Sequence, residues 1–170
     1  LAGCLAALKA AGYDTTGVFA SECHERRYKL LKAGGGFGML FTDMESDEAT
    51  LRAPPTMVWC LTADCSELTG ENANATEAGR RALLGSIEGA MRYPREMADR
   101  GEPCLAIIFE NSATLTTRFK PLGEELVSFL GDLMPEYVLR TQVLCPTTHS
   151  GMPARRRRLF VALLLRKAMV

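Results

Sequence analysis

The chain has 170 residues, equal numbers of acidic and basic side chains, and 47% hydrophobic residues. This profile is typical of a globular domain, and it excludes both a disordered chain and one that is basic overall. No apolar run reaches the roughly 20 residues of a membrane span. The six cysteines include no C-x-x-C pair, so we expect reduced thiols, no metal site and an intracellular location.

The first part of the chain alternates helical and strand patterns. Residues 1–12, rich in Ala and Leu, predict a helix that Gly12 ends. A basic helix is expected over residues 24–33, and an acidic loop or short helix over residues 45–55. Three short apolar runs predict strands at residues 17–22, 39–43 and 57–61.

The remainder opens with the longest helical pattern, residues 76–100, which Pro94 should kink or split. A second helix is expected over residues 122–134, where Gly131 could interrupt it. Further strands are predicted at residues 104–109, 137–145 and 159–165. Alternating helices and apolar strands predict an α/β fold with a mostly parallel, doubly wound sheet.

Four chemically useful side chains follow apolar runs directly: Glu22, Asp43, Cys65 and Glu110. Parallel strands would bring them to one rim of the sheet, where α/β proteins bind ligands. An acid at such a position holds ribose hydroxyls in nucleotide-binding folds, and Asp43 could accept from an adenine amino group. Taken singly, each carboxylate is equally well explained as a solvated loop residue, and Cys65 as a packed thiol.

Taken in order, the motifs resemble those of the DNA (cytosine-5)-methyltransferases. Residues 2–12 resemble the end of that family's glycine-rich first motif, and residues 64–70 (DCSELTG) its Pro-Cys-Gln loop. Residues 110–112 (ENS) resemble Glu-Asn-Val, and residues 151–160 (GMPARRRRLF) resemble Gly-Val-Pro-Gln-x-Arg-x-Arg-Leu-Phe. The arginine run has an alternative interpretation as a nuclear-localisation signal or a solvated basic patch.

The resemblance implies a Rossmann-like fold that binds S-adenosylmethionine as methyl donor. Glu22 and Asp43 match the acids of the second and third motifs, which would contact the ribose and the adenine. The backbone near Gly3 would approach the amino-acid end of the cofactor. DNA or RNA is the implied partner, no metal is implied, and a eukaryotic member would be nuclear.

For catalysis, the resemblance implies that the Cys65 thiolate adds to C6 of a cytosine flipped out of the duplex. Glu110 would assist at N3 of the base. Arg156 and Arg158 would contact the O2 atom of the base and a nearby phosphate. Asn111 would support the geometry of the loop.

Three positions depart from the family pattern. Asp64 stands in place of proline, while Ser66 and Ala154 each replace a glutamine. Asp64 puts a negative charge beside the nucleophile, which should raise the pKa of the thiol. The family's first strand and target-recognition region have no counterpart in this sequence, so we expect residues 1–170 to be a partial catalytic domain.

Other interpretations stay open at this point. The same chemistry could act on tRNA instead of DNA. The chain could be a degenerate, non-catalytic binding module that keeps the methyltransferase fold. It could also be an unrelated nucleotide-binding α/β protein, because short motifs match by chance.

Overall fold

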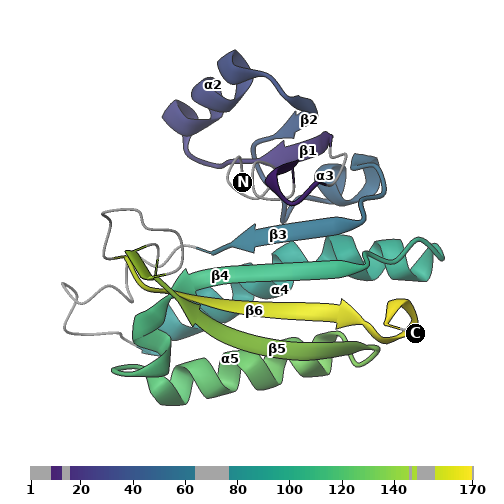
Figure 1. The fold of residues 1–170 in the computed structure, drawn as a ribbon. Helices are drawn as coiled ribbons and strands as arrows, with labels where there is room; N and C mark the ends of the chain where they lie inside the picture. The colour runs from purple at the N-terminus through teal and green to yellow at the C-terminus, as the bar shows by residue number, and fades with distance from the viewer. Residues whose placement is uncertain (1–8, 13–15, 64–76, 146, 149–155, 170) are drawn as a thin grey trace.

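The computed structural model describes residues 9–12, 16–63, 77–145, 147–148 and 156–169. Its strands form two sheets (Figure 1). The smaller one pairs two parallel strands, β1 (Gly17–Ser21) and β2 (Phe37–Phe41). The larger one has the order β3-β4-β6-β5, and these strands span, in that order, Val58–Thr62, Ala106–Ser112, Arg158–Leu165 and Tyr137–Leu144. β3 and β4 are parallel, whereas β6 is antiparallel to both of its neighbours.

Helices connect the strands and cover one face of the larger sheet. α4 (Glu77–Asp99) and α5 (Lys120–Leu133) lie behind that sheet in Figure 1. Parallel strands need such crossover connections, because a tight turn cannot join them. The remaining helical segments are α2 (Glu25–Gly34), α3 (Asp47–Arg52) and the 3-10 turns η2 (Ala113–Thr116) and η3 (Arg166–Ala168).

Local sequence explains where several helices begin or end. Ser46 precedes α3, and its hydroxyl accepts a hydrogen bond from the Ala49 amide at 3.2 Å, as an N-cap does. α5 carries Pro121 in its first turn, where the missing amide hydrogen costs nothing. Gly12 has a φ of 88°, and its amide donates to the Lys9 carbonyl, which fits the predicted helix end. The rest of that predicted first helix lies outside the described residues.

The core lies between the larger sheet and its two long helices. Side chains alternate along β4, so Ile107 and Phe109 face the helices and are at most 1% exposed. Leu163 of β6 and Leu126 and Leu130 of α5 are fully buried against them. Within the described part of the chain, no helix combines the length and apolar character that a membrane crossing requires.

The two sheets meet through aromatic side chains. Phe19 of β1 stacks on Trp59 of β3, with ring centroids 5.3 Å apart, and Tyr93 of α4 contacts both rings at 5.0 Å. The Tyr93 hydroxyl donates to the Pro54 carbonyl at 2.7 Å. Among the described residues no strand pairs with both β1 and β3, so side-chain packing holds this junction.

The predicted α/β fold is confirmed, and three local predictions are wrong. Pro94 does not split α4, which is a single helix, because tertiary packing of the buried Pro94 outweighs the lost backbone hydrogen bond; the alternative of a kink stays a prediction. Gly131 does not interrupt α5. β4 continues past Phe109 to Ser112, since its last three residues pair with the first residues of β6.

Candidate active site

The carboxyl ends of β3 and β4 lie side by side because these strands are parallel neighbours. Thr62, the last residue of β3, is the Cα partner of Glu110 in β4. β4 then continues through Asn111 and Ser112. This edge of the sheet therefore brings Ala63, the residue after β3, next to the polar end of β4, and such an edge is where open α/β sheets gather ligands.

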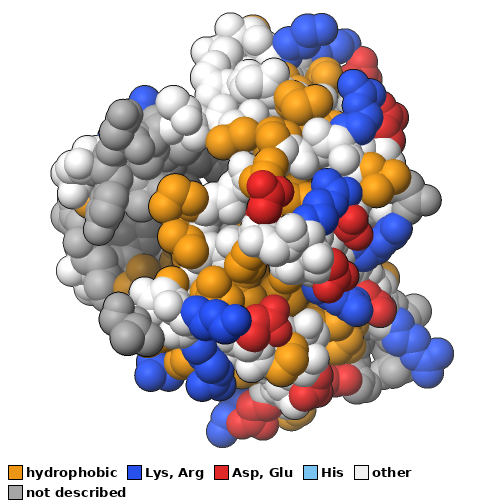
Figure 2. All heavy atoms as spheres, turned by 90° about the vertical axis from the view of Figure 1, so that its right-hand side faces the viewer, with side chains coloured by type: hydrophobic (Ala, Val, Ile, Leu, Met, Phe, Trp, Pro, Cys, Tyr) orange, Lys and Arg blue, Asp and Glu red, His pale blue; other side chains and the backbone are white. Residues whose placement is uncertain are grey.

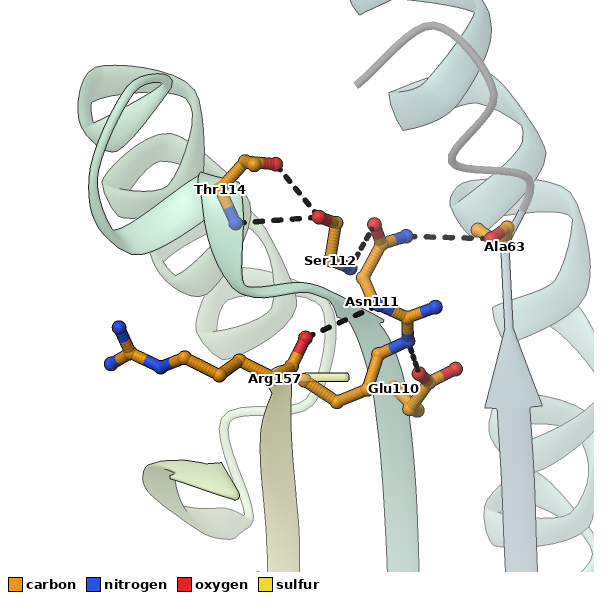
Figure 3. Close-up of polar contacts among 7 residues, drawn as sticks. Ala63, Glu110, Asn111, Ser112, Thr114 and Arg157 are labelled. Carbon is orange, nitrogen blue, oxygen red and sulfur yellow. Dashed lines mark hydrogen bonds and ion pairs between the residues drawn. The ribbon is translucent and has the colours of Figure 1, made fainter. Parts of the chain in front are cut away.

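Glu110 forms an ion pair with Arg158 of β6 (Figure 3). The Arg158 Nε donates to Glu110 Oε1 at 2.7 Å, and the two side chains are only 19% and 24% exposed, respectively. Arg158 pairs with Ser112, two positions after Glu110, so both side chains project from one sheet face as diagonal neighbours. The side chain of Arg157 points away from Glu110 in Figure 3.

Two opposing effects act on the pKa of the Glu110 carboxyl. Burial raises this pKa, because a low-dielectric environment disfavours the charged form. The positive charge of Arg156 and a hydrogen bond with Thr62 lower it, and the ion pair with Arg158 acts in the same direction. The net direction is upward. Glu110 can therefore hold a proton at higher pH than an ordinary glutamate, as a general acid requires.

Asn111 connects the end of β4 to the beginning of the segment that carries Cys65. Its side chain is 1% exposed, and its Nδ2 donates to the Ala63 carbonyl at 3.4 Å (Figure 3). Its Oδ1 accepts from the Ser112 amide at 2.7 Å. A buried amide that satisfies both ends in this way has a fixed orientation. The expected role of Asn111 in supporting the loop stays a prediction, because the residues after Ala63 lie outside the described part of the chain.

Ser112 completes the strand end by starting the next element. Its hydroxyl accepts from the Thr114 amide at 3.3 Å and from the Thr114 hydroxyl at 2.8 Å (Figure 3). This cap turns the chain from β4 into η2. The ENS motif thus contains one ionisable side chain at the sheet edge and two that fix the backbone around it.

Several predicted site residues lie outside the described part of the chain. These are Cys65, Gly3 and the three positions that depart from the family pattern, Asp64, Ser66 and Ala154. Their placement stays a prediction. Of the other predicted catalytic residues, the structure brings Glu110 and Arg158 into contact, and exposed Arg156 lies near enough for its charge to act on Glu110.

Glu22 and Asp43 lie at the carboxyl ends of the two strands of the smaller sheet. The Glu22 amide donates to the Phe41 carbonyl at 3.1 Å, which brings the end of β1 against the end of β2. Glu22 Oε1 accepts from the His24 amide at 2.9 Å, and Asp43 Oδ1 accepts from the Glu45 amide at 2.8 Å. Each carboxylate is thus oriented by the backbone of its own loop.

Thr62 is a site residue that sequence reasoning missed. It is exposed at the end of β3, it is the Cα partner of Glu110, and its side chain lowers the pKa of the Glu110 carboxyl. The signal was a hydroxyl residue directly after the apolar run of β3. Among the residues that the structure describes, no three His, Cys, Asp or Glu side chains gather closely enough to hold a metal ion.

Comparison with known sequences returns no match, either to a family model or to a curated protein. Comparison with solved structures does find relatives of the fold. A Dnmt2 methyltransferase from S. pombe superposes with a TM-score of 0.60 at 16% identity, over 94% of this chain and 45% of that one.

Two further structures support the same fold. A putative DNA modification methyltransferase encoded in an E. coli prophage superposes with a TM-score of 0.59 at 11% identity, over 94% of this chain and 42% of its own. A mutant DNMT2 from Spodoptera frugiperda superposes with a TM-score of 0.55 at 17% identity, over 93% of this chain and 45% of that one. The chain thus spans less than half the length of each of these proteins, and it shares the Rossmann-like fold of the part that it covers.

Proposed function

We propose that the chain belongs to the catalytic domain of a cytosine-C5 methyltransferase that acts on DNA, with Cys65 as nucleophile and S-adenosylmethionine as methyl donor. One observation carries the proposal. Two contacts, one between Asn111 and the Ala63 carbonyl and one between Glu110 and Arg158, join three separate segments at one sheet edge. These segments are the ones whose motifs resemble the nucleophile, acid and arginine motifs of that family.

The residues at the ends of β1 and β2 suit the methyl donor. Glu22 and Asp43 present carboxylate acceptors on neighbouring parallel strands, which match ribose hydroxyls and an adenine amino group. Each carboxylate has one oxygen held by a backbone amide, which fixes its direction. S-adenosylmethionine supplies an electrophilic methyl group when bound. Gly3 would approach its amino-acid end, as the resemblance implies.

Cytosine C5 is a poor nucleophile, so the enzyme must first add electrons to the ring. The Cys65 thiolate forms a bond to C6, and the displaced electron pair makes C5 able to take the methyl group. Protonated Glu110 donates to N3 of the ring and thereby favours this addition. Methyl transfer to C5 releases S-adenosylhomocysteine. Solvent water then accepts the C5 proton, the electron pair of the C5–H bond re-forms the C5–C6 double bond, and the C6–S pair leaves with the Cys65 thiolate. The proton on N3 returns to Glu110.

Arg158 prepares Glu110 for that role. The ion pair holds the carboxyl ionised while burial favours its protonated form. A base whose O2 accepts from the Arg158 guanidinium competes with Glu110 for the same donor. Substrate binding therefore favours protonation of Glu110 at the moment when N3 needs a proton.

The nucleic acid would approach the edge where β4 ends and β6 begins. Arg156 and Arg158 belong to this edge, and such side chains suit phosphate and base contacts. The opposite side of the molecule, where β3 and β4 begin, carries positive and negative side chains interspersed (Figure 2). The target base must leave the stack, because C5 and C6 are unreachable inside a duplex.

The test is an oligonucleotide containing 5-fluorocytosine, which traps the covalent intermediate because fluorine at C5 cannot leave as a proton does. The parent protein with S-adenosylmethionine should form an adduct that survives denaturation and that Cys65→Ser abolishes. Cys60→Ser, a cysteine within β3, is the matched control and should retain the adduct.

The outcomes separate the competing interpretations. An adduct with RNA but not with DNA would replace the proposed substrate by the tRNA alternative. Binding of S-adenosylhomocysteine without any adduct would favour a non-catalytic module, which Asp64 beside the nucleophile makes the leading rival. Failure to bind S-adenosylhomocysteine at all would remove the methyltransferase proposal.

A further inference from the structure

Glu45 connects the loop after β2 to the long helix α4. Its Oε1 accepts a hydrogen bond from the Ser86 hydroxyl at 2.8 Å, although the two residues are 41 positions apart. Its backbone carbonyl accepts from Arg92 Nη1 at 3.2 Å. Two side chains of α4, about 1.7 turns apart, thus hold both the side chain and the main chain of Glu45.

Gly89 provides the space for this contact. A Cβ atom at Gly89 would lie 2.8 Å from Glu45 Cγ, which is closer than real Cβ atoms approach other atoms, and a tight 3.1 Å from Glu45 Cδ. The Glu45 side chain therefore lies directly on the helix surface at Gly89. Gly85, one turn earlier in α4, has nothing within 4 Å of the same hypothetical atom.

The fixed Glu45 in turn orients Asp43. The Glu45 amide donates to Asp43 Oδ1 at 2.8 Å, and the Ser46 hydroxyl donates to the Asp43 carbonyl at 2.9 Å. An unbroken series of contacts therefore leads from α4 through Glu45 to the Asp43 carboxylate. The loop that carries Asp43 and Glu45 is followed by α3, which has only six residues. The 23-residue α4 is a longer and more rigid element against which this loop can be fixed.

We propose that Ser86 and Gly89 are positioning residues that set the direction of the Asp43 carboxylate through Glu45, and so determine selectivity for the adenine amino group of the methyl donor. This inference rests on the proposed function, because it concerns the same cofactor site. Ser86 and Gly89 do not touch the cofactor themselves. Glu45 is exposed, so its contacts with α4 add little to global stability and act mainly on the loop.

The first experiment compares Gly89→Ala with Gly85→Ala. Both changes replace a glycine inside α4 and raise helix propensity alike, but only the first displaces Glu45. Titration calorimetry would measure the affinity for S-adenosylhomocysteine and for S-inosylhomocysteine, which has a carbonyl oxygen where adenine has its amino group. An oriented Asp43 carboxylate accepts from the former and repels the latter.

We expect Gly89→Ala to reduce the ratio of the two affinities about tenfold, as the loss of one charge-assisted hydrogen bond would. Gly85→Ala should keep the parent ratio. Ser86→Ala should reduce the ratio as well, and Ser86→Thr, which retains a hydroxyl, should restore it. An unchanged ratio in both Gly89→Ala and Ser86→Ala, with the parent binding S-adenosylhomocysteine, would overturn the inference.

A second readout does not depend on any ligand. The Glu45 amide proton is held by Asp43, so its exchange with solvent should become several-fold faster in Gly89→Ala and Ser86→Ala but not in Gly85→Ala. Unchanged exchange would contradict the positioning role even if the cofactor binds. If exchange responds while the parent fails to bind S-adenosylhomocysteine, the proposed function fails, and the assignment to cofactor selectivity fails with it.

Discussion

The molecule consists of two regions that are packed very differently. The four-stranded unit, meaning β3 to β6 with α4 and α5, contains most of the fully buried side chains. The two-stranded unit, meaning β1, α2 and β2, has no buried residue in α2, and Leu30 of that helix is 66% exposed. Its main anchor is Phe19, which packs on Trp59 and Tyr93.

This difference in packing means that the four-stranded unit contributes most of the stability, whereas the proposed cofactor contacts lie on the less stable two-stranded unit. The proposed acid and arginine lie on the four-stranded unit, where burial can fix their geometry and shift the pKa of Glu110. The proposed cofactor carboxylates lie on the two-stranded unit, where few apolar contacts restrain them. Loosely packed segments open locally at low free-energy cost, and a bound ligand stabilises them. The comparison predicts that substitutions of the same kind have unequal effects in the two units.

The largest contrast is expected between two leucine-to-alanine changes in helices. Leu130→Ala in α5 removes a side chain that is 0% exposed, and it should lower the free energy of unfolding by about 3 kcal/mol through the cavity it leaves. Leu30→Ala in α2 should change it by less than about 0.5 kcal/mol. Urea denaturation measures both. Equal losses would show that the two units are equally well packed.

A smaller effect is expected at the end of β4, where Asn111 contacts the Ala63 carbonyl. Asn111→Ala removes the contacts with the Ala63 carbonyl and the Ser112 amide, and it should cost about 2 kcal/mol of stability. It should also slow formation of the 5-fluorocytosine adduct. Ser112→Ala, which loses only the cap of η2, should cost about 1 kcal/mol. If both variants formed the adduct at the parent rate, Asn111 would have no positioning role.

The smallest effect concerns the junction between the units. Burial raises the pKa of Tyr93 to about 12, partly offset by a hydrogen bond with Thr56. An unfolded tyrosine titrates near pH ~10, so unfolding releases a proton between these values and the protein loses stability as pH rises through this window. Tyr93→Phe should cost about 1 kcal/mol at neutral pH, where the bond to Pro54 is lost.

The alkaline behaviour of that variant provides its check. Without a titrating group at position 93, stability should fall less steeply between pH ~10 and ~12 than in the parent protein. Thermal melting across this range measures both slopes. Tyr28→Phe, the same substitution at a half-buried position in α2, is the control. Identical slopes in Tyr93→Phe and the parent would show that the junction does not bury an un-ionised tyrosine.

Element types followed from sequence because each depends on near neighbours. Apolar residues three or four apart predicted α4 and α5, and short apolar runs predicted all six strands. The predictions were wrong where contacts with residues distant in sequence determine whether a helix or strand continues. Pro94 argued for a broken helix, yet packing against the core keeps α4 continuous. The end of β4 was misjudged by three residues because β6 extends the pairing there.

For the candidate site, the sequence determined which residue types stand at strand ends, and their order supplied the likeness to methyltransferase motifs. The sequence could not reveal that Asn111 donates a hydrogen bond to Ala63, 48 positions away, or that Ser86 donates one to Glu45, 41 positions away. Those contacts depend on strand register and on where a helix crosses a loop. Only the folded chain sets these distances, because burial and pairing energies are summed over the whole core rather than read from neighbouring residues.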